Sequence, residues 1–170
     1  QGVSITSFKA PTEEERQHDF LWRIRKALPS KGRIGVFDRS HYEDVLIARV
    51  RSLAPAEEIE RRYDEINDFE TEVAGAGITM IKCMLHISPE EQRERLLARL
   101  DDPTKLWKFD PGDIDDRALW SSYQEAYEVA LGRCNTSAAP WLLVPSDRKW
   151  YPNWAVGAVL LETMRTLELG

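Results

Sequence analysis

The segment GRIGVFDRSHYEDV, residues 32–45, decides how the rest of the chain is interpreted. Its apolar run over residues 33–37 has the length of a buried strand, and an acid and a base, Asp38 and Arg39, follow it at once. In parallel sheets that helices cover, ligands bind at the carboxyl ends of the strands. The segment therefore predicts a strand that carries two charged side chains to a binding site.

Strands and helices alternate along the chain. Four apolar or β-branched runs predict strands, over residues 3–8, 33–37, 78–87 and 141–146. Capping signals and helical periodicity predict the helices, over residues 12–28, 40–50 and 56–75, from residue 88 onward, and over 123–131 and 154–169. This alternation indicates an α/β fold, a single domain over residues 1–170 with one parallel sheet and helices on both of its faces.

Asp38 has two interpretations on the residues alone. A carboxylate at a strand end can hold a magnesium ion beside a nucleotide, directly or through water. It can also cap the helix that follows, although Ser40 is better placed to do so. Arg39 can clamp a phosphate with two hydrogen bonds, or it can pair with a nearby acid such as Glu43 or Asp44.

The region 101–118 is polar, contains two prolines and a glycine, and predicts an excursion or lid. Arg95 and Arg99 lie four residues apart just before it, and thus share one helix face. With two lysines from the region they form a basic set that can gather phosphates: Arg95, Arg99, Lys105 and Lys108. The alternative is a solvated helix face in which the arginines pair with Glu91 and Glu94.

Composition excludes several classes of function. The net charge of −6 disfavours binding to DNA or RNA, whose phosphates attract basic surfaces. The apolar runs are too short to span a bilayer, and the first residues do not resemble a signal peptide. Two unpaired cysteines, Cys83 and Cys134, fit reduced thiols, so we expect a cytoplasmic protein without a membrane partner. His86 and Trp150 are interpreted as core or cover residues.

A phosphate-cradling loop of the form Gly-x-x-x-x-Gly-Lys, which commonly binds nucleotides, does not occur in the sequence. The glycines of GAG, residues 75–77, precede a strand and not a helix. Any nucleotide chemistry must therefore use other groups of this sequence, or else residues that lie outside it.

Three long stretches together resemble the polyphosphate kinase 2 family. They are FKAPTEEERQHDFLWRIRKALPSKGRIGVFDRSHYEDVLIARV (8–50), LHISPEEQRERLLARLDDPTKLWKF (85–109) and APWLLVPSDRKWYPNWAV (139–156). Within them, HDFLWR and HYEDV are most similar to the subgroup that phosphorylates both AMP and ADP. The resemblance implies a P-loop kinase-like parallel sheet with a helical lid over about 89–118, whose first strand and P-loop lie outside this sequence.

The resemblance also implies a function and a set of site residues. Family members transfer a phosphoryl group between inorganic polyphosphate and nucleotides such as AMP, ADP or ATP, with Mg²⁺. Asp38 would be the Walker B acid that holds the metal, and Arg39 and Arg99 would contact the transferred phosphoryl group. The remaining residues would bind polyphosphate (Arg95, Lys105 and Lys108) or nucleotide (Lys9, Asp19, Arg23 and Glu43).

The missing loop leaves an alternative open. The sequence predicts either a polyphosphate-dependent kinase whose isolated 170 residues are inactive, or a non-catalytic subunit or fragment that binds polyphosphate or nucleotide. In the first case we also expect a homo-oligomer, either a dimer or a tetramer. An ATP-dependent kinase of the same fold is a third interpretation, which the segment DRSHYED disfavours by resemblance.

Overall fold

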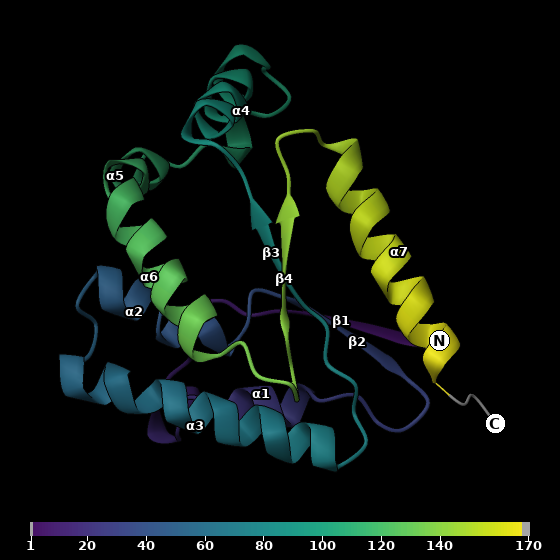
Figure 1. Ribbon diagram of the computed structural model, residues 1–170. Coiled ribbons are helices and arrows are strands. Elements are labelled where there is room, and N and C mark those ends of the chain that lie inside the picture. The colour runs from purple at the N-terminus through teal and green to yellow at the C-terminus, as the bar shows by residue number, and fades with distance from the viewer. Residues whose placement is uncertain (1, 168–170) are drawn as a thin grey trace. The chain divides into compact units, whose positions relative to one another are not determined.

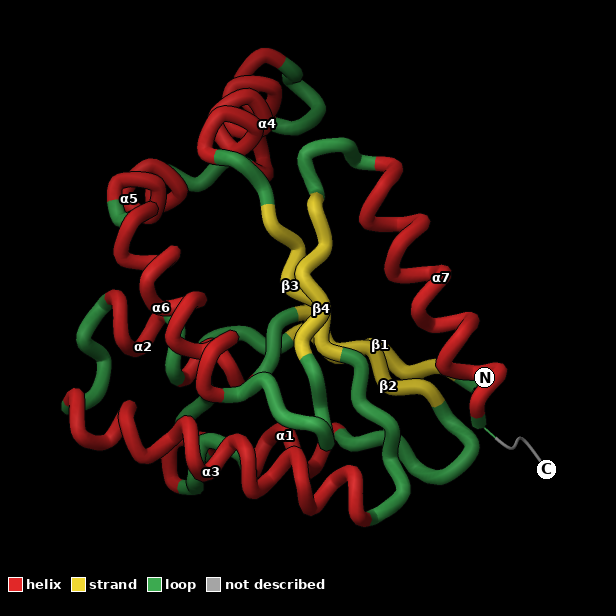
Figure 2. The backbone as a smooth tube through the Cα atoms, in the orientation of Figure 1, coloured by secondary structure: helices red, strands yellow, loops and turns green. Residues whose placement is uncertain are grey.

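The computed structural model describes residues 2–167 (Figure 1). The chain divides into two compact units. The first consists of the residues up to Met80 together with Ser122–Ala139, and the second of Ile81–Ser121 together with the chain from Pro140 onward. Each unit contains one parallel pair of strands, drawn in yellow in Figure 2.

The first unit is built around the pair β1 and β2, in which Val3 lies opposite Ile34 and Ser7 opposite Asp38. Its elements in chain order are β1 (Val3–Ser7), the 3-10 turn η1 (Glu15–Gln17), α1 (Trp22–Ala27), β2 (Ile34–Asp38), the 3-10 turn η2 (His41–Asp44), α2 (Ile47–Val50) and α3 (Ala56–Gly75). Most of α6 (Trp120–Arg133) also belongs to it.

The core of the first unit confirms the predicted helix over 56–75. Ile59, Ile66, Phe69 and Val73 are all buried along one face of α3. Phe69 and Val73 join a cluster that includes Ile24 of α1 and Phe8, which follows β1 directly. Burial of one such side chain contributes about 1.5–3 kcal/mol. The helix ends at the predicted GAG, where Gly77 has φ +84°, a conformation that suits glycine.

The second unit contains the other strand pair, in which Lys82 lies opposite Trp141 and His86 opposite Pro145. Its elements are β3 (Lys82–His86), α4 (Pro89–Asp101), the 3-10 turn η3 (Leu106–Lys108), α5 (Gly112–Ala118), β4 (Trp141–Pro145) and α7 (Trp150–Thr166). The predicted cap of α4 is confirmed, because the Ser88 hydroxyl accepts a hydrogen bond from the Glu91 amide at 3.1 Å.

The α/β class with parallel strands is confirmed, but the prediction of one sheet is not. The described residues form two separate two-stranded sheets, β1–β2 and β3–β4. Apolar runs show which segments become strands, whereas the pairing of strands depends on contacts between residues far apart in the sequence. The sequence pattern therefore predicts the strands better than their order.

Two predicted helices are interrupted. Over residues 12–28, Thr12 and Glu15 form the expected reciprocal capping bonds, at 2.8 and 3.2 Å, but only η1 follows before the chain restarts as α1. The Asp19 carboxylate accepts a hydrogen bond from the Leu21 amide at 3.0 Å, a local bond that competes with helix continuation. Over residues 40–50 the chain likewise forms η2 and then α2.

Two further boundaries differ from the prediction. The strand expected over 78–87 is reduced to β3, because Ile78 and Met80 pack against the core of the first unit instead. The last helix begins at Trp150, earlier than predicted, and the predicted end at residue 169 lies outside the described residues. Cys83 and Cys134 are both free thiols, as expected. Over residues 2–167, the helices all fall short of the length or apolar character that crossing a bilayer requires.

Candidate functional site

The end of β2 presents Asp38 at the surface of the first unit. The strand register places Ser7 opposite Asp38, and the Ser7 hydroxyl donates a hydrogen bond to the Asp38 carboxylate at 3.0 Å. The Phe8 amide donates to the Asp38 carbonyl at 3.1 Å. Both the backbone and the side chain of Asp38 are thus held by the neighbouring strand, while the carboxylate stays exposed.

The backbone turns sharply after Asp38. Arg39 has φ +63°, the left-handed region that non-glycine residues adopt at a cost of about 1–3 kcal/mol. Ser40, not Asp38, then caps η2, because its hydroxyl accepts a hydrogen bond from the Tyr42 amide at 3.4 Å. The capping alternative for Asp38 is therefore wrong, and both Asp38 and Arg39 remain exposed. We call residues 38–44 the Asp38 turn.

Two acids close the Asp38 turn in partly buried positions. Burial raises the pKa of Glu43 above its ordinary value, and the nearby Arg39 opposes that rise. Burial also raises the pKa of Asp44, against the attraction of Arg23 and Arg62, whose nitrogens lie 3.7 and 3.9 Å from its carboxylate oxygens. The predicted pairing alternative for Arg39 thus survives as a weak attraction to Glu43.

The other predicted nucleotide-binding residues lie in the same unit. Arg23 is 8% exposed, and its guanidinium donates a hydrogen bond to the Lys9 carbonyl at 2.7 Å. Lys9 itself is exposed just beyond β1, whereas the Asp19 carboxylate bonds the backbone ahead of α1. Arg23 therefore contacts the backbone of Lys9 and the carboxylate of Asp44, whereas the Asp19 carboxylate is engaged in a hydrogen bond within a local turn.

The predicted basic set lies in the second unit, and three of its four members, Arg95, Arg99 and Lys105, are engaged in ion pairs. The Arg95 guanidinium donates to Glu91 at 2.7 Å, which matches the predicted alternative pairing, and to the Ser146 carbonyl at 2.5 Å. Arg99 donates to Asp113 at 2.9 Å, a partner that lies in the polar region and was not predicted. We call residues 89–118 the lid segment.

The two lysines of the lid segment also have protein partners. Lys105 pairs with Asp102, and this bond together with hydrogen bonds from Thr104 lowers the pKa of Asp102 to about 2. Lys108 places its ammonium group 5.0 Å from the centre of the Trp107 ring, a side chain that is 78% exposed. Exposed ion pairs such as that of Lys105 contribute little to stability.

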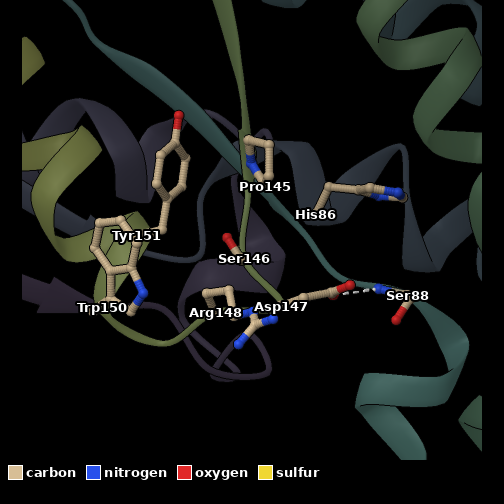
Figure 3. Close-up of a pocket in the computed structure, with 8 residues that line it drawn as sticks. All are labelled: His86, Ser88, Pro145, Ser146, Asp147, Arg148, Trp150 and Tyr151. Carbon is tan, nitrogen blue, oxygen red and sulfur yellow. Dashed lines mark hydrogen bonds between the residues drawn. The ribbon is translucent and has the colours of Figure 1, made fainter.

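A cavity of about 340 Å³ opens beside the ends of β3 and β4 (Figure 3). Its walls are His86, Ser88, Pro145, Ser146, Asp147, Arg148, Trp150 and Tyr151. The Asp147 carboxylate accepts a hydrogen bond from the Ser88 amide at 2.8 Å, the dashed line in Figure 3. His86 and Trp150 thus line a cavity, contrary to their interpretation as core and cover. His86 is the last residue of β3, and Trp150 begins the helix that follows β4; this closeness to strand ends is the signal that could have found them.

A magnesium ion fits Asp38 only in a particular way. Within residues 2–167, the structure contains no group of three or more His, Cys, Asp or Glu side chains arranged to hold a metal. Mg²⁺ commonly keeps several waters and is held by one or two carboxylates together with substrate phosphates. A single exposed carboxylate beside the Ser7 hydroxyl matches that donor set.

Comparison with known proteins gives consistent matches. A family model described as Polyphosphate kinase 2 (PPK2) matches residues 1–169. An AMP/ADP-polyphosphate phosphotransferase from Meiothermus ruber is 48% identical, and an ADP-polyphosphate phosphotransferase from Rhodopseudomonas palustris is 41% identical, each over 99% of this chain. The crystal structure of Polyphosphate Kinase 2 from Arthrobacter aurescens TC1 superposes with a TM-score of 0.97 at 54% identity, over 99% of this chain.

The matches cover only part of these relatives. The chain spans 63% of the length of each of the two curated relatives and 60% of the Arthrobacter chain.

Proposed function

The chain belongs to the polyphosphate kinase 2 family, and from this premise we propose that the protein transfers a phosphoryl group between inorganic polyphosphate and AMP or ADP. The observation that carries the proposal is the Asp38 turn, where an exposed carboxylate and an exposed guanidinium follow each other on a backbone that β1 holds. Phosphoryl transfer requires mainly positioning and neutralisation of charge, which such a pair supplies.

Asp38 is the residue that would hold Mg²⁺ in this proposal. A bound magnesium ion would neutralise charge on the phosphate oxygens and orient them. The support for this role is the hard oxygen donor at the end of β2, with Ser7 fixing one of its two oxygens at 3.0 Å. Arg39, next to it, would donate to the phosphoryl group as negative charge spreads over its oxygens.

Polyphosphate would bind to the basic residues of the lid segment. Arg99 would contact the transferred phosphoryl group, while Arg95, Lys105 and Lys108 would bind the rest of the chain. Each now contacts a carboxylate, a carbonyl or an aromatic ring. The contacts of the two arginines are part-buried and those of the two lysines are exposed, so a phosphate would replace the partners of the lysines at the lower cost.

The nucleotide would be bound by residues of the first unit. Lys9 and Arg39 supply exposed cations for its phosphates, and Glu43 supplies a partly buried carboxyl group that can distinguish acceptors. Arg23 would act mainly by holding the Lys9 backbone, at 2.7 Å, since its side chain is 8% exposed. Asp19 would also belong to the nucleotide-binding residues.

The proposal extends to the fold and the assembly. A P-loop kinase-like sheet, with its first strand and phosphate loop outside this sequence, accords with two sheets of only two strands each among the described residues. We further propose a cytoplasmic homo-oligomer that binds neither DNA nor RNA, in keeping with the net charge of −6.

The experiment is an assay of the complete protein, including any residues beyond these 170. It contains Mg²⁺, AMP or ADP as acceptor, and either long-chain polyphosphate or ATP as donor. We expect faster transfer from polyphosphate. Faster transfer from ATP would assign the protein to the ordinary nucleotide kinases. Polyphosphate binding without transfer from either donor would instead favour the non-catalytic binding subunit.

A further inference from the structure

A buried carboxylate lies behind the Asp38 turn. Glu70, in the middle of α3, has 0% exposure, and one of its oxygens accepts a hydrogen bond from the Tyr42 hydroxyl at 2.8 Å. The same oxygen lies 3.2 Å from Nε2 of His41. His41 and Tyr42 are 3% and 2% exposed, and burial together with the nearby Glu70 raises the pKa of Tyr42, which keeps its hydroxyl protonated as a donor.

Such a carboxylate is costly to bury. A charged group loses its hydration in the interior, and well-packed apolar side chains of similar volume often serve stability as well or better. The helical face around Glu70 is otherwise suited to an apolar residue, since Phe69 and Val73 beside it are 1% and 2% exposed. We therefore expect Glu70 to have a role that an apolar side chain at this position could not perform.

The partners of Glu70 indicate that role. His41 and Tyr42 are consecutive residues of η2, and only Ser40 separates them from Arg39 with its left-handed backbone. On the other side of the turn, β1 fixes Asp38 through the Phe8 amide and the Ser7 hydroxyl. If nothing held the backbone after Arg39, Arg39 could relax to an ordinary backbone conformation, and its side chain would then move away from Asp38.

We propose that Glu70 is a positioning residue, which holds His41 and Tyr42 and thereby fixes Arg39 beside Asp38 for phosphoryl transfer. This inference rests on the proposed function for its catalytic consequence, but not for its structural one. The sequence gives little indication of it, because a glutamate on a long helix is ordinarily solvated.

The test compares three variants of the full chain. Glu70→Met removes the acceptor, Glu70→Gln keeps an acceptor oxygen without the charge, and Val73→Ala removes buried methyl groups from the same helix without touching the turn. Hydrogen exchange of the segment spanning residues 38–45 is measured at matched global stability. Kinetic constants are measured with polyphosphate and AMP. If Glu70→Met does not fold, Tyr42→Phe, which deletes the hydroxyl donor to Glu70, takes its place.

In Glu70→Met we expect exchange of residues 38–45 to accelerate about tenfold, the factor that corresponds to loss of one hydrogen bond. We also expect kcat to fall by about tenfold while the KM for AMP changes by less than about twofold, as for loss of an interaction needed only in the transition state. Glu70→Gln should recover most of both effects, and Val73→Ala should show neither.

Exchange and kcat in Glu70→Met that match those of Val73→Ala would overturn the inference. If the parent protein transfers nothing from polyphosphate, the proposed function fails, yet the exchange comparison still decides whether Glu70 fixes the turn.

Discussion

The Asp38 turn and the lid segment both present charged side chains, but they hold them in different ways. In the Asp38 turn, strand hydrogen bonds on one side and buried side chains on the other fix the backbone, and the charged groups of Asp38 and Arg39 stay exposed. In the lid segment, the charged groups themselves are occupied by ion pairs such as Arg99 with Asp113 and Lys105 with Asp102.

If both regions bind phosphate as proposed, the difference separates two ways of preparing such a site. A fixed turn loses little entropy when its ligand binds, because its geometry exists beforehand. Exposed ion pairs contribute little to stability, typically below about 1 kcal/mol, so their cations can exchange a carboxylate for a phosphate. We therefore expect substitutions in the turn to affect the chemical step most and a substitution of Arg99 to affect it less, whereas substitutions of the two lid lysines should affect affinity and its dependence on salt.

The largest effect is expected for Asp38→Asn. The change is nearly isosteric but removes the charge that would hold magnesium, so turnover should fall on the order of 10³-fold while the melting temperature stays close to that of the parent. Turnover and thermal unfolding are measured on the same samples. Asp68→Asn, at an exposed position of α3, is the matched control. Parental turnover of Asp38→Asn at limiting magnesium would remove Asp38 from the mechanism.

Arg99→Ala should come next. In the proposed function Arg99 would neutralise charge on the transferred phosphoryl group, so its loss should lower kcat by about 10²- to 10³-fold. The free energy of unfolding should change by less than about 1 kcal/mol, because the pair with Asp113 is part-exposed. Arg93→Ala on the same helix, whose partner Glu94 is also exposed, serves as the control. A large loss of stability with an unchanged rate would show that Arg99 is structural.

A smaller effect is expected when Lys105 and Lys108 are both replaced by alanine. Affinity for long-chain polyphosphate should fall several-fold, and AMP affinity should change less. The dependence of log affinity on log salt should become shallower by about 0.7 for each lost phosphate contact, if polyphosphate behaves as single-stranded nucleic acid does. Titrations at low and high salt measure both quantities. Polyphosphate binding that does not depend on salt in the parent would contradict this role of the lid segment.

The smallest effect concerns pH, and its sign should differ between the two regions. Burial raises the pKa of Glu43, so the stability linked to this group is complete below its ordinary pKa of 4.5 and is lost as pH rises through the raised value. The pKa of Asp102 is lowered from 3.8 to about 2, so its stabilisation is present above 3.8 and is lost as pH falls towards 2.

Denaturant unfolding of Glu43→Gln and Asp102→Asn over this pH range measures both signs. Relative to the parent, Glu43→Gln should gain stability as pH rises above 4.5, and Asp102→Asn should lose its disadvantage as pH falls below 3.8. If the stability difference from the parent changed with pH in the same direction in both variants, the two regions would not differ in how they shift the pKa of their acids.

The sequence by itself determined the features that depend on neighbouring residues. The α/β class, the long helix α3, the cap of α4 at Ser88 and the exposed pair Asp38 and Arg39 at the end of β2 all follow from periodicity, capping and strand-end position. These signals act within a few residues, so one sequence contains them in full. The resemblance to the polyphosphate kinase 2 family likewise rested on contiguous stretches, and the comparisons confirmed it.

Only the tertiary structure decided the features that join distant residues. It replaced the expected single sheet by two strand pairs, gave Arg99 the partner Asp113, and placed Glu70 against the side chains of His41 and Tyr42. A glutamate on a helix reads the same in the sequence whether its carboxylate contacts water or accepts a hydrogen bond from a tyrosine hydroxyl. Its role depends on which surfaces fold against it, and that is set by the balance of packing over the whole unit and not by any local pattern.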